Sequence, residues 1–275
     1  MNNKIDTSLN EDWMKILWDW ADKYQLDEEV IPRNKADLLS LTTIAIDTTY
    51  EYAGYYANSN RLPDDYYTTP LYHMEEVPKE LAYLPRLEDV YFNNVDASNF
   101  IEKISQLTHL KSLDISAVKI RQLPEDINKL QKLESLYIWG DGLKELPETI
   151  CQIKTLKSLF VRSNSIQALP SNLNKLQNLE SLEFESNHIV DIPSSVFKLP
   201  GLEALSVHGD QIKEIPSTII GLEGLKYLEL FTENLTSVPA NIAKLPNLEF
   251  IKTYSSLWPI LSYYIDESKV EVMLI

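Results

Sequence analysis

Few side chains in this sequence could act as a nucleophile, a general base or a metal ligand. Cys151 is the single cysteine, which excludes a disulfide framework and an all-cysteine metal site. It directly follows Ile150 and has no base near it in the sequence, so we interpret it as a packed thiol rather than a nucleophile. The histidines show no spacing typical of metal ligands; they are His73, His109, His188 and His208.

Nucleotide-binding loops are missing as well. The glycines are scattered, and Gly140-Asp141-Gly142 lacks both the third glycine of a dinucleotide turn and the Gly-Lys-Ser/Thr of a phosphate loop. No constellation of histidine and carboxylate can be assembled around His208, which we interpret as a contact residue rather than a general base. The sequence therefore implies no metal and no cofactor, and we predict that the chain is not an enzyme.

Composition and charge narrow the class of partner. The chain has 275 residues, of which 44% are hydrophobic and 24% charged, as in folded globular proteins. Its net charge of −16 would repel a nucleic-acid backbone. It has no run of about 18 apolar residues and no apolar signal segment at its start. We therefore expect no nucleic acid and no membrane as partners, and a cytoplasmic location, with export by a specialised secretion system left open.

A repeat of 23 residues organises most of the chain. An apolar residue follows each repeated leucine at the third position, and with one exception, Thr253, another follows two residues later. The repeated leucines are Leu87, Leu110, Leu133, Leu156, Leu179, Leu202, Leu225 and Leu248. The second half of the unit carries an aliphatic residue followed by proline, at Leu123-Pro124, Leu146-Pro147, Leu169-Pro170, Ile192-Pro193, Ile215-Pro216 and Val238-Pro239.

The unit L-x-x-L-x-L predicts a short strand with its leucines on one face and the intervening residues on the other. The proline suits the start of a short turn or helix, because its fixed φ fits that position and its missing N–H is not needed there. One unit cannot bury its own leucines, so neighbouring units must stack into a continuous core. A curved solenoid follows.

This pattern resembles the leucine-rich repeat family, in particular its 23-residue LPxxIxxL class. Members occur among plant intracellular Ras-group proteins, Ras-pathway scaffolds and bacterial cytoplasmic and effector proteins. The resemblance implies an α/β fold: a right-handed solenoid with a parallel concave sheet and short helices or 3-10 turns on the convex side. It also implies that Asn164 and Asn187 bond to loop backbone inside the coil.

The chain is expected to divide into four segments. Residues 1–40 should form an N-terminal helical cap, and residues 41–86 an enlarged first repeat with a tyrosine-rich insertion at about 48–75. Regular repeats should occupy residues 87–254, and residues 255–275 a C-terminal cap. The insertion is either a cap or a binding arm. The cap helix is indicated by apolar residues at helical spacing, namely Trp13, Ile16, Leu17, Trp20, Ala21 and Tyr24.

The family resemblance places repeat positions 3, 5 and 7 on the concave face. Six of the sixteen residues at positions 5 and 7 are aromatic, an enrichment over the 10% in the whole chain that favours a binding surface. The alternative is that these rings only stack on one another and stabilise the sheet. The candidate partner-binding residues are Tyr91, Tyr137, Trp139, Phe160, Arg162, Glu183, Glu185, His208, Tyr227, Glu229, Phe231, Phe250 and Tyr254.

Two groups stand out among these candidates. The first combines rings with a cation and should form a compact anchor; it consists of Tyr137, Trp139, Phe160 and Arg162. The second is an acidic stretch suited to basic side chains of a partner; it consists of Glu183, Glu185 and Glu229. At position 2, charges alternate in sign from Glu88 to Glu180, which we interpret as structural pairing between strands.

These observations favour a non-catalytic, monomeric module that binds a protein with a basic or mixed apolar and basic surface. One alternative is an inhibitor or immunity-type protein that blocks a basic enzyme or toxin. Another is an effector with ligase-type or hydrolytic activity that uses Cys151 or His208.

Overall fold

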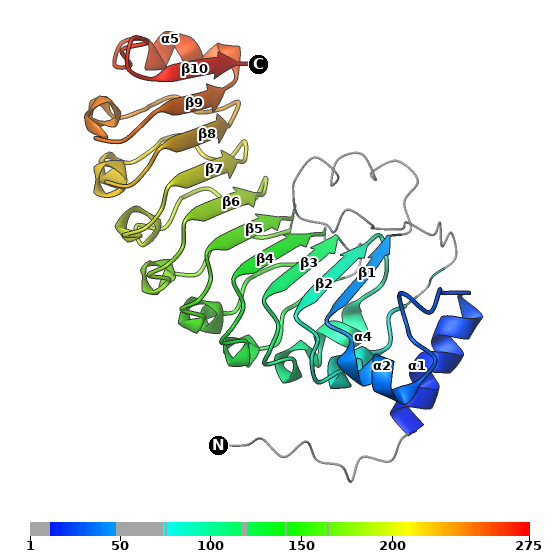
Figure 1. The fold of residues 1–275 in the computed structure, drawn as a ribbon. Coiled ribbons are helices and arrows are strands. Elements are labelled where there is room, and N and C mark those ends of the chain that lie inside the picture. Colours follow the sequence, from blue (N-terminus) through cyan, green and yellow to red (C-terminus); the bar gives the residue numbers. More distant parts are fainter. Residues whose placement is uncertain (1–11, 48–73, 75, 117–119, 141, 164) are drawn as a thin grey trace.

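The computed structural model describes the chain except for residues 1–11, 48–73, 75, 117–119, 141 and 164. The described residues form an arc of stacked coils, with short strands on the inner side and short helical turns on the outer side (Figure 1). The ten strands of the described residues lie in one parallel sheet, in the order of the sequence. They are β1 Thr43–Asp47, β2 Asp89–Asn93, β3 Ser112–Ser116, β4 Ser135–Trp139, β5 Ser158–Arg162, β6 Ser181–Glu185, β7 Ala204–His208, β8 Tyr227–Phe231, β9 Phe250–Thr253 and β10 Glu271–Leu274.

The outer side of the arc carries the helical turns. Most are single 3-10 turns that follow the aliphatic-proline pair, as expected from the fixed φ of proline. The 3-10 turns are η1 Lys79–Tyr83, η2 Ile104–Gln106, η3 Ile127–Lys129, η4 Glu148–Gln152, η5 Leu173–Lys175, η6 Val196–Lys198, η7 Ser217–Gly221, η8 Ala240–Lys244 and η9 Ser255–Leu257. The α-helices are α1 Asp12–Lys23, α2 Lys35–Ser40, α4 Ser98–Ile101 and α5 Trp258–Leu261.

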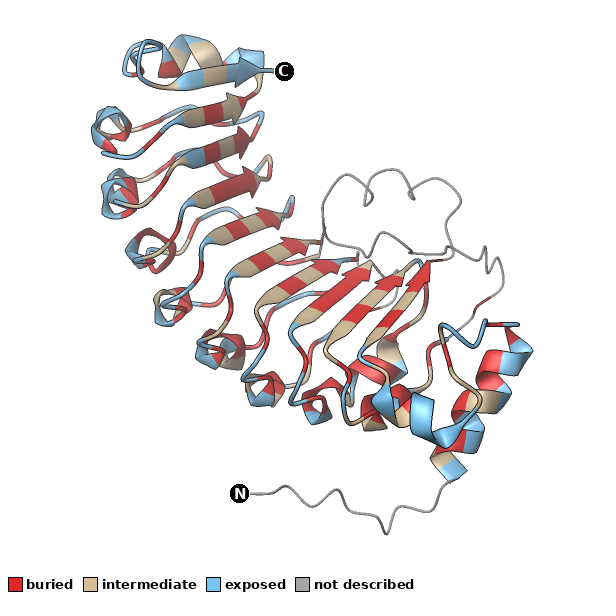
Figure 2. Ribbon diagram, in the orientation of Figure 1, coloured by how far each residue is buried: buried red, intermediate tan, exposed pale blue. Residues whose placement is uncertain are grey.

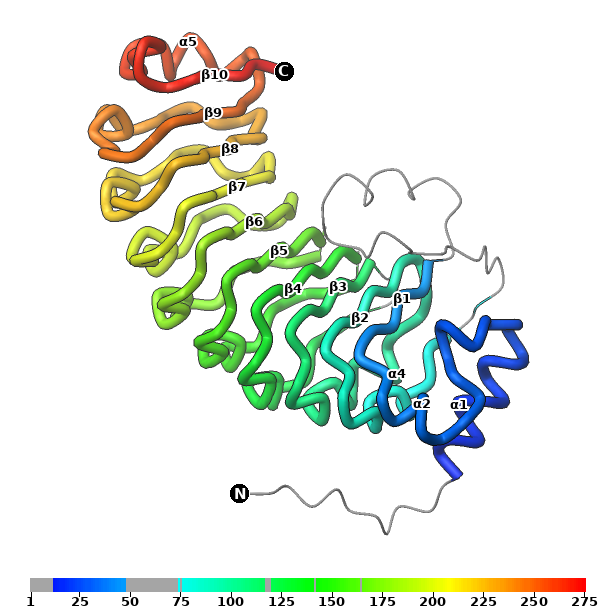
Figure 3. Tube along the Cα trace, in the orientation of Figure 1, coloured from blue at the N-terminus to red at the C-terminus, as the bar shows by residue number. Residues whose placement is uncertain are grey.

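The 23-residue period sets the register of the sheet. From β2 to β9, residues opposite one another are 23 positions apart, as Leu113 and Leu136 are. The Cα trace shows the result, in which each coil lies directly on the one before it (Figure 3). The parallel solenoid that the repeat predicted is confirmed.

The first strand pair is different. Thr43 on β1 lies opposite Asp89 on β2, so two repeat lengths of sequence separate neighbouring strands of the sheet. The tyrosine-rich segment predicted at about 48–75 falls in this interval and lies almost entirely outside the described residues. The division of the chain into four segments stays a prediction.

The repeated leucines form the core. All eight leucines of the 23-residue column are buried, as are the apolar residues three and five positions after each one. In Figure 2, buried and partly exposed residues alternate along several strands, for example β2, β5 and β6. Thr253, the exception in the apolar pattern, is fully buried, and its hydroxyl donates to the carbonyl oxygen of Leu230 at 2.9 Å. That hydrogen bond makes the burial of a polar side chain tolerable.

Serine rather than asparagine bonds to the loop backbone inside the coils. The Ser163 hydroxyl donates to the carbonyl oxygen of Leu143 at 2.9 Å, and the Ser186 hydroxyl to that of Ile166 at 2.5 Å. Asn187, for which this role was expected, is exposed. The expectation was therefore wrong for Asn187, because the preceding residue already points inward. Asn164 lies outside the described residues.

Helix α1 covers the N-terminal end of the coils (Figure 1). It buries Met14, Leu17, Trp20 and Ala21, and the Trp20 indole N–H donates to the carbonyl oxygen of Glu76 at 3.0 Å. The predicted apolar face is corrected at Ile16, which is 45% exposed while Met14 takes the buried position. Helix α2 then leads into β1.

At the other end, the expected cap adds a strand to the sheet. Residues 255–275 form η9, α5 and β10, and β10 pairs with β9 in parallel. The side chains at the end of β10 are only partly covered: Met273 and Leu274 are 45% and 41% exposed.

Candidate protein-binding surface

The candidate residues lie on the strands of the inner face, except Tyr254, which directly follows β9. Alternate strand positions point to opposite sides of the sheet, and the leucines take the core side. Strand pairing then joins side chains that are distant in sequence. Tyr137 on β4 lies opposite Phe160 on β5, and Trp139 lies opposite Arg162. Tyr91 on β2 is set apart from this group, because Asp114 on β3 lies between it and Tyr137.

The predicted aromatic and cationic group is formed in the structure, and we call it the aromatic anchor: Tyr137, Trp139, Phe160 and Arg162. The rings of Tyr137 and Phe160 are stacked, with centroids 4.4 Å apart and 25° between their planes. The Arg162 guanidinium lies 5.9 Å from the centroid of the Trp139 ring. The Trp139 side chain is nevertheless 46% exposed, so a large apolar surface faces the hollow of the arc.

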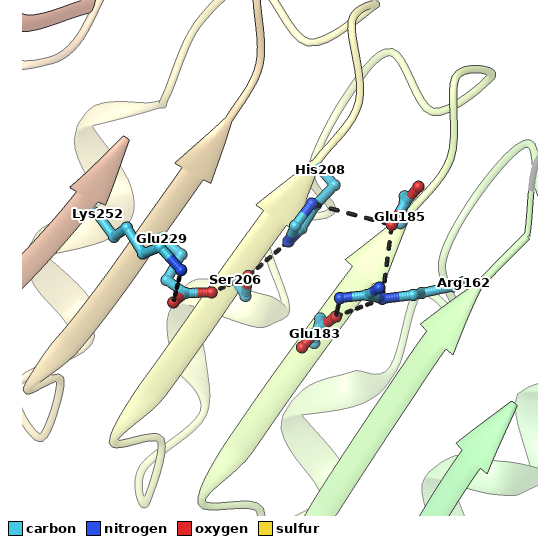
Figure 4. A network of polar contacts seen from close by, with 7 residues as sticks. All are labelled: Arg162, Glu183, Glu185, Ser206, His208, Glu229 and Lys252. Atoms are coloured by element: carbon cyan, nitrogen blue, oxygen red, sulfur yellow. Dashed lines mark hydrogen bonds and ion pairs between the residues drawn. The ribbon is translucent and has the colours of Figure 1, made fainter. Parts of the chain in front are cut away.

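Next to the anchor, a polar network crosses five strands from β5 to β9 (Figure 4). Its members are Arg162, Glu183, Glu185, Ser206, His208, Glu229 and Lys252. Two nitrogens of Arg162 contact Glu183 Oε1, at 2.6 Å from Nε and 2.5 Å from Nη2. Glu185 Oε2 lies 3.5 Å from Arg162 Nε and 3.9 Å from His208 Nδ1.

The acidic stretch is therefore not an open row of carboxylates. Glu183 forms an ion pair with Arg162, and the Glu183 side chain is only 13% exposed. Glu229 is held differently: Ser206 donates to its Oε2 at 2.8 Å, and Lys252 Nζ lies 3.8 Å from its Oε1. Sequence reasoning assigned neither Ser206 nor Lys252 to the site, although both occupy position 5 of their repeats.

A second aromatic group lies at the C-terminal side of the network. The Phe231 ring packs against His208 with centroids 4.5 Å apart and against Tyr254 at 5.6 Å. Phe231 is consequently buried, at 9% exposure, which corrects its expected place among the solvent-facing rings. Tyr227 and Phe250 form a looser pair with centroids 6.4 Å apart, and Tyr227 is 46% exposed.

Tyr91 and its surroundings are more enclosed. Burial raises the pKa of the Tyr91 hydroxyl, and a hydrogen bond with Ser112 partly opposes this shift. Asp114 on the next strand is buried, with 7% exposure. This part of the face offers less accessible area than the aromatic anchor does.

His208 has a serine and a carboxylate beside it, yet the three groups do not form a general-base relay. The Ser206 hydroxyl has one proton and donates it to Glu229, so His208 Nε2, at 2.9 Å from Ser206 Oγ, must be the donor to that oxygen. A general base would need this nitrogen unprotonated. Burial, followed by the charges of Arg162 and Lys252, lowers the pKa of His208 to about 4. The ring is therefore neutral near pH 7.

Comparison with known proteins addresses the family. Residues 85–188 match the sequence model of a family described as a leucine-rich repeat region. The leucine-rich repeat domain of the type III effector XopL superposes with a TM-score of 0.63 over 98% of this chain and 97% of that domain, at 19% identity. The chain contains a leucine-rich repeat region and has the fold of a leucine-rich repeat solenoid.

Other solved structures superpose less well. The plant peptide hormone receptor RGFR1, in complex with RGF2, aligns over 89% of this chain but only 41% of the receptor chain, with a TM-score of 0.48 and 15% identity. A leucine-rich repeat protein of Leptospira interrogans aligns over 94% of this chain and 98% of its own, with a TM-score of 0.32 and 18% identity. No curated protein sequence is significantly similar to the chain.

In this solenoid, Cys151 lies on the convex side, in η4. Its side chain is 1% exposed, and burial, aided by the nearby Glu148 carboxylate, raises the pKa of its thiol to about 11. The thiol is therefore almost entirely protonated near pH 7. Nucleophilic chemistry needs the thiolate, so this environment disfavours it.

The charged row at the margin of the leucine-rich repeat sheet pairs laterally, as its alternation of sign indicated. Lys111 contacts Glu88 at 2.6 Å and Lys157 contacts Glu134 at 2.8 Å, each between neighbouring strands. These pairs are largely exposed and contribute little to stability.

The described residues contain no group of three or more histidine, cysteine, aspartate or glutamate side chains placed to hold a metal ion. Within the same residues, no helix has the length and apolar character required to span a bilayer.

Proposed function

We propose that this chain is a non-catalytic module that binds a protein partner on the concave face between β4 and β9. Leucine-rich repeat solenoids generally present extended concave surfaces for binding other proteins. The observation that carries the proposal is the aromatic anchor, in which an almost half-exposed Trp139 stands beside the stacked rings of Tyr137 and Phe160. Large rings fixed in place bind with little loss of side-chain entropy.

The chemistry of the face supports a partner with mixed apolar and basic character. The anchor offers apolar area, and the polar network beside it carries three carboxylates against the cations of Arg162 and Lys252. Because the network is largely neutralised from within, apolar contact should supply most of the affinity. The carboxylates should then select which partner fits, since charge complementarity governs specificity and association rate.

A second candidate function is inhibition of a basic enzyme or toxin. The net charge of −16 favours it, because a strongly acidic surface attracts and orients a basic protein. This role predicts one tight complex that weakens steeply as salt is added. A general scaffold would show several partners and a smaller dependence on salt.

The experiment is affinity capture from native lysate with three versions of the protein, followed by mass spectrometry. The versions are wild type, the double variant Trp139→Ala with Phe160→Ala, and Gln177→Ala, which alters an exposed side chain on the convex side. We expect a protein retained by wild type and by Gln177→Ala to be lost with the double variant. Retention by all three versions would contradict the proposal.

A further inference from the structure

We propose that the concave face recognises a protein segment that presents a basic side chain to Glu229 and, about 14 Å away, an apolar side chain to the aromatic anchor. This inference rests on the proposed function and names the chemistry of the partner segment. It also selects Glu229 from the three carboxylates of the network.

The hydrogen bonds distinguish these carboxylates. Arg162 Nε and Nη2 both contact Glu183 Oε1 at 2.6 Å or less, so this carboxylate is already paired. The same arginine and His208 both face Glu185 Oε2, so a cation arriving there would meet a guanidinium already in place. Neither carboxylate offers an incoming cation a free approach.

The Glu229 carboxylate is held by one short hydrogen bond, and its ion pair with Lys252 is long (Figure 4). Ser206 fixes one carboxylate oxygen at 2.8 Å, whereas Lys252 Nζ lies 3.8 Å from the other oxygen, beyond hydrogen-bonding distance. The same Nζ is 5.4 Å from the centroid of the Phe231 ring. A carboxylate next to a ring stabilises an ammonium or guanidinium group, and Lys252 shows that a cation fits there. A basic side chain of the partner would displace this resident lysine.

The register of the sheet fixes the distance to the anchor. Phe160, Glu183, Ser206 and Glu229 occupy the same position on four successive strands. Three strand spacings separate Phe160 from Glu229, which is about 14 Å. An extended segment covers this distance in about four residues, and an α-helix in about nine.

The test uses a random 12-residue peptide library displayed on phage and selected against the whole chain. We expect the enriched peptides to share a lysine or arginine and an aromatic or large aliphatic residue, about four positions apart if extended or about nine if helical. Selection against Glu229→Gln should yield peptides without the conserved basic residue. Selection against Glu249→Gln, which removes an exposed carboxylate at the margin of β9, should retain it.

Affinity of the enriched peptide for single variants gives a second readout. Glu229→Gln should weaken binding about tenfold, while Lys252→Gln should strengthen it several-fold because the competing cation is gone. Weaker binding by Lys252→Gln, or equal binding by Glu229→Gln and wild type, would overturn the assignment.

The failure of this inference can be separated from the failure of the proposed function. If enriched peptides lack a basic residue but lose binding to Trp139→Ala with Phe160→Ala, the concave site stands and the Glu229 assignment is wrong. If peptides are not enriched, or bind that double variant as well as wild type, both are wrong.

Discussion

Tyr137 and Phe160 stack face to face across β4 and β5, with ring centroids 4.4 Å apart. This contact stabilises the sheet and also fixes the surface to which we assign binding. Stability and binding must therefore be measured on the same variants, because a ring that only supports the sheet would affect the first and leave the second unchanged.

For the anchor, we expect Trp139→Ala to lower the free energy of unfolding by only about 1 to 2 kcal/mol, since almost half of the side chain is exposed. Phe160→Ala should lower the free energy of unfolding through the loss of its buried apolar area. The lost stacking with Tyr137 should add about 1 kcal/mol to that loss. Urea denaturation of the two single variants checks both values. A loss of several kcal/mol on Trp139→Ala would identify that ring as part of the core.

Two glycines provide a matched test of how closely the coils stack. A Cβ at Gly209 would lie 2.5 Å from the carbonyl oxygen of Ser186 in the preceding coil, whereas at Gly201 the nearest atom would be 3.5 Å away. Gly209→Ala should therefore destabilise the fold by about 2 kcal/mol or more, and Gly201→Ala by less than about 0.5 kcal/mol. Thermal or urea unfolding of both variants measures the difference. Equal effects would mean that the coils can separate at no cost.

The stability of the fold should depend on pH through His208. Its pKa is lowered from 6.5 to about 4, first by burial and then by Arg162 and Lys252, an effect that outweighs the facing carboxylate of Glu185. Between pH 6.5 and pH 4 the unfolded chain binds a proton at this residue that the folded chain does not. Stability is therefore lost as pH falls through that window, by up to about 3 kcal/mol from this residue.

The measurement is urea denaturation between pH 4 and pH 7 of wild type and two variants. His208→Gln should flatten the dependence on pH, while His188→Gln, which replaces an exposed ring, should leave it as in wild type. Parallel curves for all three proteins would show that His208 titrates normally.

The environment of Cys151 predicts slow thiol chemistry. Because the side chain is buried and its pKa is raised to about 11, a disulfide reagent at pH 7.5 should leave the native protein unmodified and label it fully in guanidinium chloride. Rapid stoichiometric labelling of the native protein would reopen the hypothesis of a cysteine-dependent activity.

The core could be predicted from the sequence because a single set of side chains recurs at a fixed spacing. Every leucine of the 23-residue column is buried, and strand positions follow from that column. Thr253 broke the pattern of residue types without breaking the fold, since its hydroxyl finds a carbonyl inside the coil. Periodicity describes which face a residue takes; it succeeded for the leucine column, whereas helical spacing misplaced Ile16.

Contacts between neighbouring coils were harder to predict. The alternation of the strand placed Phe231 on the concave face but could not show that His208 and Tyr254 would flank and bury its ring. Likewise, the sequence predicted that the acidic stretch is open to a basic partner, whereas in the structure Arg162 forms an ion pair with Glu183. Such contacts depend on rotamers of residues one repeat apart, which a pattern of residue types does not specify.

Mapping which face touches the partner tests the central claim most directly. A photoreactive benzoylphenylalanine is placed at position 116, which lies opposite Trp139 on the concave side, or at position 177 on the convex side. Each protein is irradiated with the captured partner. We predict a cross-link from position 116 and none from position 177. Cross-linking from position 177 alone would contradict it.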